Sequence, residues 1–495
     1  MNRKEVSDFI TQNNFDVQSA RACFYVMDAV YSAYADSEKI HKSKYSPIIF
    51  YLTPDNLQLF YQILPKKYMK KLSNKIYSDY QKNSKNLESL IAGHLGVTKK
   101  IDALFNQYYN ENELNEKIIL KYFSKINKLF YLWWQYGIIG EDKGEIIDSE
   151  IVPKFQKRHN LNYEKAKEII NELSHPDELT FFNQERILFL KICLSIGKKD
   201  IQKYITEYLK KFFWIGTDFY QAKLITEKSL IEDAIREIKT KGEKKIKEEL
   251  ENITRGNINR LQNKTKIKES IKLNQEDRAD LKFCEKIVSW FDLRKFIYMG
   301  HFYHIFAMLK EIAKRHKIDY YMLSFYSTKE IEELLDSGKK VSKSLLQKRQ
   351  GSVFCIYNYG NINKKNYIYG KEGKKLFDII AKKFLSNFVS GVVASKSKEK
   401  IVFGRVRIII NPKNEKFKSG EILVTSMTRI EFVPLMRNAK AIITNEGGMA
   451  CHAAIVSREL GIPAIIGTKN ATQILKDGDQ VEMNMQTGEI RIIKK

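Results

Sequence analysis

The sequence predicts a multidomain protein that is mainly α-helical in its N-terminal and central regions and ends in an α/β domain. At 495 residues the chain exceeds what one hydrophobic core accommodates, so about two to four domains are expected. Apolar residues recur at three- and four-residue spacing through roughly the first 350 residues, as in amphipathic helices. Short β-rich runs that alternate with helix-like segments then follow, which is typical of a small open-sheet domain.

Four segments of the helical part show the helical spacing most clearly. They are Asn2–Tyr34, Pro65–Leu95, Asn112–Gly137 and Ser289–Ile318, and Gly300 is a candidate interruption of the last one. After them, Ser327 and Glu330 indicate a capped helix start, and residues 352–358 and 366–369 are strand-like. We therefore expect three domains: a helical domain over 1–275 that is a candidate acceptor or partner-binding region, a connecting element over 276–387 that is helical and then α+β, and a final α/β domain over 388–495.

Composition restricts the class of protein. The N-terminus is polar, and no segment approaches 18 uninterrupted apolar residues, so neither a signal peptide nor a membrane span is expected and the sequence predicts a cytoplasmic protein. The five cysteines stand singly, which fits neither a disulfide framework nor a zinc site, and no metal site is expected. The net charge of +26 suggests nucleic-acid binding, but the lysines are interleaved with glutamates along the chain, which favours solvated helix faces.

The most informative motif lies in the final α/β domain. Five β-rich runs are expected there: Val406–Ile410, Ile422–Ser426, Ala441–Thr444, Ala464–Ile466 and Val481–Met485. The third run leads into the paired glycines Gly447 and Gly448, and a helix is expected from His452 to Leu460. The first turn of a helix leaves N–H groups unpaired and carries the positive end of the dipole, so His452 would lie where an anion is stabilised. A neutral imidazole there can attack a phosphoryl group.

A lone histidine at a helix start is more often a cap or a core-edge residue than a nucleophile, so spacing alone does not decide its role. Three longer segments carry more information about the role of His452, because together they resemble a known family. They are residues 420–428 (Gly-Glu-Ile-Leu-Val-Thr-Ser-Met-Thr), 447–456 (Gly-Gly-Met-Ala-Cys-His-Ala-Ala-Ile-Val) and 458–467 (Arg-Glu-Leu-Gly-Ile-Pro-Ala-Ile-Ile-Gly). With these, Val406–Ile493 resembles the phosphohistidine swivel domain of phosphoenolpyruvate-utilising enzymes, as in phosphoenolpyruvate synthase, pyruvate phosphate dikinase, rifampicin phosphotransferase and glutamine-kinase-type enzymes.

The resemblance implies a phosphotransferase in which His452 carries the phosphoryl group. It implies that Gly447, Gly448 and Cys451 shape the phosphohistidine loop, with Thr444 and Ser426 as local hydrogen-bond donors. In that family an ATP-grasp domain phosphorylates the histidine, with Mg²⁺ accompanying the nucleotide. Residues 1–350 are helical in texture and poor in glycine-rich loops, so we expect ATP to be bound by a separate ATP-grasp partner in trans. The residues after His452 are far fewer than the ~250 that a phosphoenolpyruvate-binding barrel requires.

The helical part resembles the central region of synthase-like small-molecule kinases less closely, through residues 173–182 and 212–220. The resemblance implies that this region helps to form the acceptor site, for which six residues are candidates: His175, Trp214, Asp218, Tyr220, Arg294 and His301. Each also has a structural interpretation as a turn, core or helix-face residue.

Three functions therefore remain open at this stage. The first is a phosphotransferase component that is incomplete without its partner and passes the phosphoryl group to a small-molecule acceptor. The second is a non-catalytic regulatory or partner-binding protein that retains the swivel fold. The third is a basic nucleic-acid-binding protein, whose affinity would fall steeply with salt. We prefer the first, because the strand, the glycine turn, the histidine and the capped helix agree with one another.

Overall fold

The computed structural model describes residues 8, 10–11, 15–41, 48–52, 59–138, 146–217, 219, 221–357, 365–384, 389–397, 399–412, 416–447, 451–468 and 470–494. The chain divides into two compact units. The first comprises Met1–Ile146, Asp218–Tyr220 and His304–Lys495, and the second comprises Ile147–Thr217 and Gln221–Tyr303. The three-domain division expected from the sequence stays a prediction.

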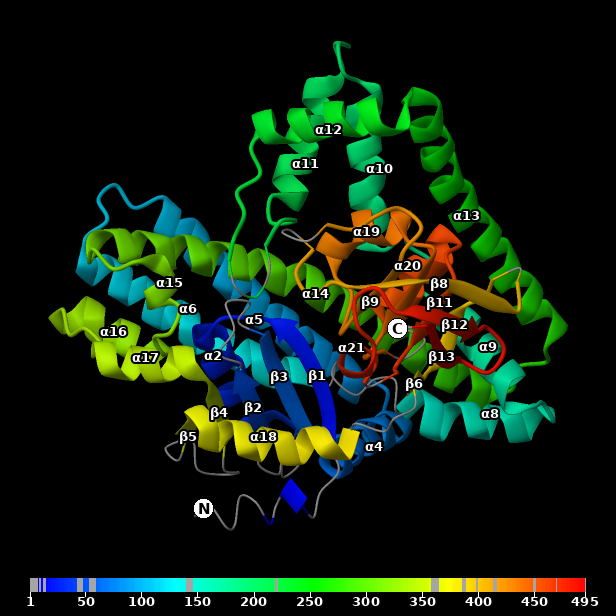
Figure 1. The fold of residues 1–495 in the computed structure, drawn as a ribbon, viewed down its shortest axis with the longest axis horizontal. Coiled ribbons are helices and arrows are strands. Elements are labelled where there is room, and N and C mark those ends of the chain that lie inside the picture. Colours follow the sequence, from blue (N-terminus) through cyan, green and yellow to red (C-terminus); the bar gives the residue numbers. More distant parts are fainter. Residues whose placement is uncertain are drawn as a thin grey trace. The chain divides into compact units, whose positions relative to one another are not determined.

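The first unit contains a five-stranded antiparallel sheet in the order β1-β3-β2-β4-β5 (Figure 1). Its strands are β1 (Phe15–Arg21), β2 (Ile48–Leu52), β3 (Leu59–Pro65), β4 (Val353–Tyr357) and β5 (Lys365–Tyr369). Successive residues of a strand point to opposite faces. On one face of β2, the Tyr51 ring stacks on Phe377 of α18 (Gly370–Phe384) at 4.4 Å between centroids. On the other, Phe50 meets Phe24 of α2 (Phe24–Ala35) at 6.5 Å, so both faces are covered.

The helix expected over Asn2–Tyr34 is wrong in part. Residues Phe15–Arg21 form β1, which pairs with β3 along its whole length, and α2 begins only at Phe24. Phe15 and Val17 alternate with polar residues at a period of two, which is the strand period. The pairing with β3, a contact between residues far apart in the sequence, therefore makes Phe15–Arg21 a strand.

The other helices of the first unit follow the predictions more closely. They are α3 (Glu38–His41), α4 (Lys66–Lys82), α5 (Lys85–Tyr109), α6 (Glu116–Gly137), α15 (Tyr320–Leu323), α16 (Thr328–Ser337), α17 (Lys343–Gly351) and the end of α14 (Gln275–Arg315). The helical segment expected over Pro65–Leu95 is formed by α4 and the first part of α5. The capped start at Ser327 is confirmed, because its side chain accepts a hydrogen bond from the Glu330 N–H and the Glu330 carboxylate accepts one from the Ser327 N–H.

The second unit is helical throughout its described residues. It contains η2 (Ile147–Ile151), α8 (Val152–His159), α9 (Tyr163–Ser174), α10 (Phe181–Leu194), α11 (Ile201–Phe212), α12 (Glu227–Lys241), α13 (Glu243–Ser270) and the larger part of α14. Gly300 does not interrupt α14, which is continuous from Gln275 to Arg315. Buried ion pairs join these helices: Arg158 contacts Asp277 and Asp280, each at 2.7 Å.

The C-terminal region, residues 389–494, forms an eight-stranded sheet in the order β6-β13-β12-β8-β9-β10-β11-β7. Its strands are β6 (Val389–Ser390), β7 (Val392–Ser395), β8 (Ile401–Ile408), β9 (Ile422–Thr425), β10 (Ala441–Thr444), β11 (Ala464–Ile466), β12 (Gln480–Asn484) and β13 (Glu489–Lys494). Its helices are η3 (Ile430–Phe432), α19 (Val433–Asn438), α20 (His452–Leu460) and α21 (Ala471–Ile474). All five expected strands are present, within a few residues of their expected ends. β8 to β11 are mutually parallel, and apolar clusters cover both faces.

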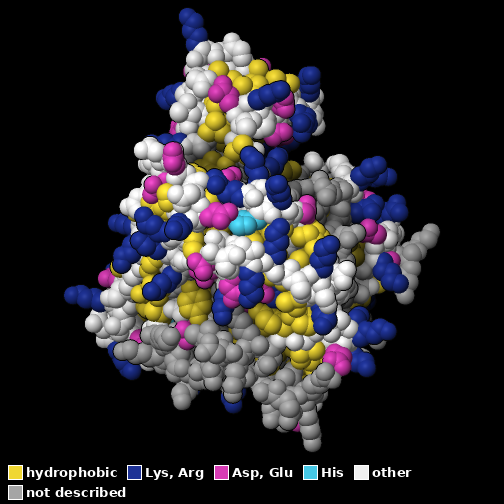
Figure 2. Space-filling model, turned by 90° about the vertical axis from the view of Figure 1, so that its left-hand side faces the viewer, with side chains coloured by type: hydrophobic (Ala, Val, Ile, Leu, Met, Phe, Trp, Pro, Cys, Tyr) yellow, Lys and Arg dark blue, Asp and Glu magenta, His cyan; other side chains and the backbone are white. Residues whose placement is uncertain are grey.

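For the described residues, the structure also bears on membrane-spanning helices, the state of the cysteines and the distribution of surface charge. No helix among them combines the length and the apolar character that crossing a membrane requires. All five cysteines are free thiols, four of them buried and Cys451 partly buried. Figure 2 shows Lys and Arg side chains scattered over one face, with Asp and Glu side chains among them, rather than gathered in one patch.

Candidate functional site

The candidate site forms where two parallel strands of the C-terminal region end. β9 and β10 run side by side with Thr425 opposite Thr444, so their carboxyl ends meet at one edge of the sheet. The pairing continues past both strands, because the Asn445 N–H donates to the Thr425 carbonyl at 3.1 Å and the Glu446 N–H donates to the Ser426 carbonyl at 2.9 Å. The residues that follow each strand are therefore held close together.

The turn after β10 depends on glycine. Gly447 has a φ of +134°, and a Cβ atom there would lie 2.6 Å from the Cys451 sulfur. A Cβ atom on Gly467, which follows β11, would lie 2.6 Å from the Gly447 carbonyl oxygen. The chain thus passes through this turn in close contact with β11 and the start of α20. Gly448, the second glycine of the predicted pair, lies outside the described residues.

Helix α20 begins at His452, as predicted. Cys451 is its N-cap, and the Cys451 sulfur accepts a hydrogen bond from the Ala454 N–H at 3.4 Å. The helix ends at Gly461, which has a φ of +65°. His452 therefore occupies the first turn of the helix, where the helix dipole stabilises negative charge. Cys451 has a structural role in this geometry, as a cap that sets the start of the helix.

His452 is only 8% exposed, and its Nδ1 atom lies 2.6 Å from the Thr428 hydroxyl oxygen. A hydroxyl can donate to imidazole nitrogen or accept from it. Where Nδ1 carries the proton and Thr428 accepts, Nε2 holds the lone pair that a nucleophile needs. Sequence reasoning missed Thr428, although it ends the motif 420–428. The signal was its position just beyond β9, the parallel neighbour of the strand that leads to His452.

Thr444 and Asn445 hold the turn in shape. The Thr444 hydroxyl donates to the Glu446 carbonyl at 2.5 Å, and the Thr444 carbonyl accepts from the Thr468 hydroxyl at 3.0 Å. Asn445 is buried, and its side chain accepts from the Thr472 N–H at 2.9 Å and donates to the Thr472 hydroxyl at 2.6 Å. Thr444 was predicted as a local donor, whereas Asn445 was missed. These hydrogen bonds fix the backbone at residues 444–446, where the turn that leads to His452 begins.

Substitution of Gly447 by alanine is expected to displace the Cys451 cap. The new methyl group would meet the Cys451 sulfur and impose a strained positive φ, so we expect a loss of about 1–3 kcal/mol in the free energy of unfolding of the C-terminal region. Thermal denaturation followed by circular dichroism measures it. Gly420→Ala is the matched control, because its φ is also positive but its Cβ would have open space. Equal losses for the two variants would show that the close approach to Cys451 does not matter.

A strand, a glycine turn and a helix that begins with a histidine are the features that the sequence analysis associated with the mobile domain of phosphoenolpyruvate-utilising enzymes. Residues 417–488 match the family described as "PEP-utilising enzyme, mobile domain". The class expected from the sequence is thereby confirmed for the C-terminal region.

Curated relatives agree over the same region. A protein of Archaeoglobus fulgidus named "Probable phosphoenolpyruvate synthase" is 54% identical over 99 residues, which cover 19% of this chain and 13% of that protein. "Phosphoenolpyruvate synthase" of Aquifex aeolicus is 47% identical over 92 residues, covering 18% and 11%. The matched segment is thus a small part of these relatives' length. A solution structure of an Enzyme I protein aligns at 14% identity over 64% of this chain and 82% of that chain, with a TM-score of 0.16, too low to establish a common fold.

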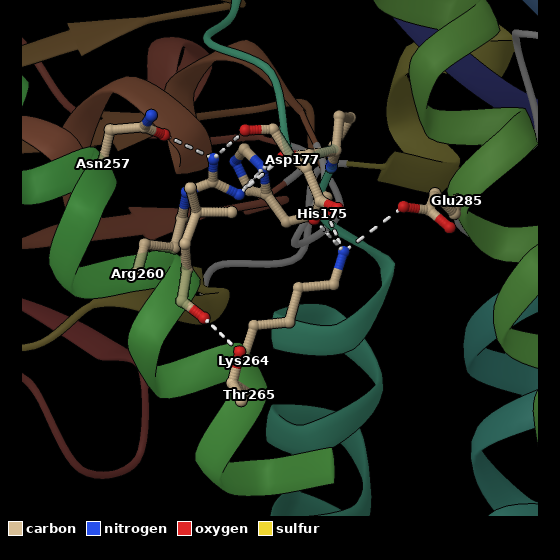
Figure 3. Close-up of polar contacts among 9 residues, drawn as sticks. His175, Asp177, Asn257, Arg260, Lys264, Thr265 and Glu285 are labelled. Carbon is tan, nitrogen blue, oxygen red and sulfur yellow. Dashed lines mark hydrogen bonds and ion pairs between the residues drawn. The ribbon is translucent and has the colours of Figure 1, made fainter.

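Of the six acceptor-site candidates, His175 is the best defined, and its contacts are shown in Figure 3. It ends α9, and Arg260 Nη1 lies 2.7 Å from its Nδ1 and 2.6 Å from the Pro176 carbonyl. A guanidinium group can only donate, so Nδ1 must accept and the proton of a neutral imidazole must be on Nε2. The 3.1 Å contact between Nδ1 and the Pro176 carbonyl is then not a hydrogen bond.

Lys264 completes this arrangement. Its side chain is 4% exposed, and Nζ donates to the His175 carbonyl at 2.8 Å, to Asp177 at 2.7 Å and to Glu285 at 3.3 Å. The hydrogen bond from Lys264 lowers the pKa of Asp177. Arg260 and Lys264 of α13 thus tie the loop after α9 to their own helix, and Lys264 also reaches α14. His175 is part of a structural network in the second unit.

The other candidates are placed as follows. Trp214 is 1% exposed and packs on Phe296 with ring centroids 5.1 Å apart, as a core aromatic residue. Arg294 is buried, with its guanidinium 4.8 Å from the Phe291 ring centroid, and His301 is buried on α14. Asp218 and Tyr220 lie outside the described residues. An acceptor site built from these residues stays a prediction. Among the described residues, no group of three or more His, Cys, Asp or Glu side chains is arranged to hold a metal ion.

Replacement of Lys264 by methionine is expected to destabilise the second unit while keeping the packing of the aliphatic stem. Three hydrogen bonds from a buried cation are lost, so we expect about 1–3 kcal/mol less free energy of unfolding, measured by chemical denaturation. Lys268→Met, an exposed lysine one helical turn further along α13, is the control. If the two variants are equally stable, the network around His175 contributes nothing to stability.

Proposed function

We propose that this chain is a phosphotransferase component in which His452 is transiently phosphorylated by an ATP-grasp partner in trans and passes the phosphoryl group to a small-molecule acceptor. ATP and its Mg²⁺ would be bound by the partner. The observation that supports this most directly is the 2.6 Å contact of Thr428 with His452 Nδ1 at the start of α20. It orients the imidazole so that Nε2 can act as the nucleophile.

The chemistry consists of two displacements at phosphorus. In the first, the Nε2 lone pair forms the N–P bond while the P–O bond to the donor breaks and the leaving oxygen keeps the electron pair. In the second, an acceptor oxygen forms a new P–O bond, the N–P bond breaks and its electron pair returns to Nε2. The N–H groups of the first turn of α20 stabilise the negative charge on the phosphoryl group, on the order of 1 kcal/mol from the dipole term.

The relatives supply a second line of support. Two proteins that share the matched segment are named for phosphoenolpyruvate synthesis, which makes a phosphotransferase role the natural proposal for the segment here. The acceptor, the donor protein and a cytoplasmic location are parts of the proposal. The regulatory and nucleic-acid-binding alternatives have no observation of their own in the described residues.

Phosphorylation of His452 is tested with γ- and β-labelled ATP, with the chain alone and with the product of any neighbouring ATP-grasp gene. We expect acid-labile label on this chain when the partner is present, and loss of that label to background in His452→Ala. His304→Gln controls for a histidine outside the C-terminal region and should label normally. No label under any of these conditions, with a folded protein, would contradict the proposal.

Thr428 provides a finer test. Thr428→Val removes the hydroxyl group but keeps the branched shape, and we expect phosphorylation of His452 to slow about 10- to 100-fold, as for the loss of one hydrogen bond to a group that becomes charged. Thr428→Ser, which keeps the hydroxyl group, should remain within a few-fold of the wild type. An equal rate for all three proteins in single-turnover labelling would show that Thr428 does not orient the imidazole.

A further inference from the structure

Arg429 directly follows Thr428, the residue that contacts His452. The Arg429 carbonyl accepts a hydrogen bond from the Phe432 N–H at 2.9 Å, at the short helix η3. Its side chain is only 12% exposed. An arginine that is mostly covered and lies one residue from the contact with His452 is not accounted for by the proposed chemistry.

The guanidinium of Arg429 lies over an aromatic ring. Its Cζ atom lies 4.4 Å from the centroid of the Phe219 ring, which is a cation–π distance. Its polar contacts are weak: Nε donates to the Met427 sulfur at 3.3 Å, and Nη1 is 3.9 Å from Glu431. Nη2 is buried and has no hydrogen-bond partner among the described residues. The ring is therefore the contact that lies against the face of the guanidinium, beside the longer ion pair with Glu431.

Phe219 is itself fixed to the start of α2. It forms a parallel β-bridge with Ala22, and its carbonyl accepts a hydrogen bond from the Cys23 N–H at 3.2 Å. Ala22 and Cys23 are fully buried. Phe219 and Arg429 belong to the same compact unit. Phe219 also lies between Asp218 and Tyr220, in the motif 212–220 that the sequence analysis associated with the acceptor.

We propose that Phe219 is the docking point within this chain for the loop after β9, which carries Thr428, and that Arg429 is the residue of this loop that binds the Phe219 ring. The backbone connects Arg429 to Thr428, and Thr428 contacts His452, so a guanidinium seated on Phe219 sets the position of the imidazole relative to α2. Both are positioning residues. The functional meaning of the docking rests on the proposed function: a carrier histidine that serves a donor in trans must return to its own chain to deliver the phosphoryl group.

Two backbone amides report on the docking without any phosphoryl donor. The Cys23 N–H is bonded to the Phe219 carbonyl, and the Phe432 N–H is bonded to the Arg429 carbonyl, so each lies on one side of the contact. Hydrogen–deuterium exchange of the full-length, unphosphorylated chain measures both. We expect Arg429→Gln to speed exchange at Cys23, and Phe219→Leu to speed exchange at Phe432, each about 2- to 30-fold, the range of a cation–π contact. The effect of each substitution is thus measured at an amide on the other side of the contact from the substituted residue.

Matched variants separate docking from local damage. Phe219→Tyr keeps the ring and should preserve wild-type exchange at Phe432, whereas Phe219→Leu keeps bulk without the ring face. Arg491→Gln removes an exposed arginine of β13 and should leave Cys23 unchanged. Exchange that rises only on the side of the substitution, or rises equally in Phe219→Tyr and Phe219→Leu, would overturn the proposal. The outcome is independent of whether His452 accepts phosphate, so the labelling experiment and this one can fail separately.

Discussion

The candidate site depends on the close approach of the turn after β10 to the first turn of α20. Only glycine fits at position 447, where a side chain would collide with the Cys451 sulfur, and only glycine at 467 leaves room for the Gly447 carbonyl. This packing places the end of β9 beside the start of the helix. Thr428 can then reach His452 Nδ1, and the imidazole acquires an orientation that a histidine at a solvent-exposed helix start would not have.

The second unit is organised by a different kind of interaction. Its helices are joined by cations that are each shared between several acceptors, such as the buried Lys264 with the loop after α9 and the partly buried Arg158 with Asp277 and Asp280. Removal of one partner from such a network is costly because the remaining charge stays buried. A site for a phosphoryl acceptor would have to be built beside these networks, since His175 accepts a hydrogen bond from Arg260 and Trp214 is a core residue.

The contact of Arg429 with Phe219 gives the loop after β9 a defined place in its own chain. A cation–π contact is weaker than a buried ion pair, and it needs no hydrogen bond that must be replaced when it opens. Under the proposed function, such a contact suits a domain that leaves its chain and returns to it. It also explains why a residue as costly to bury as arginine lies next to the residue that orients His452.

The sequence by itself determined the elements whose signals are local: the strands and the capped helix of the C-terminal region, the start of α20 at His452, and the capping box at Ser327. These depend on neighbouring residues, such as glycines, caps and short apolar runs. Only the tertiary structure decided that Phe15–Arg21 is a strand, because its partner β3 lies more than 35 residues further along the chain. The tertiary structure alone also showed that Thr428 contacts the His452 imidazole and that Arg260 donates a hydrogen bond to His175. Contacts between neighbouring strands or between helices cannot be read from the residue spacing within either segment.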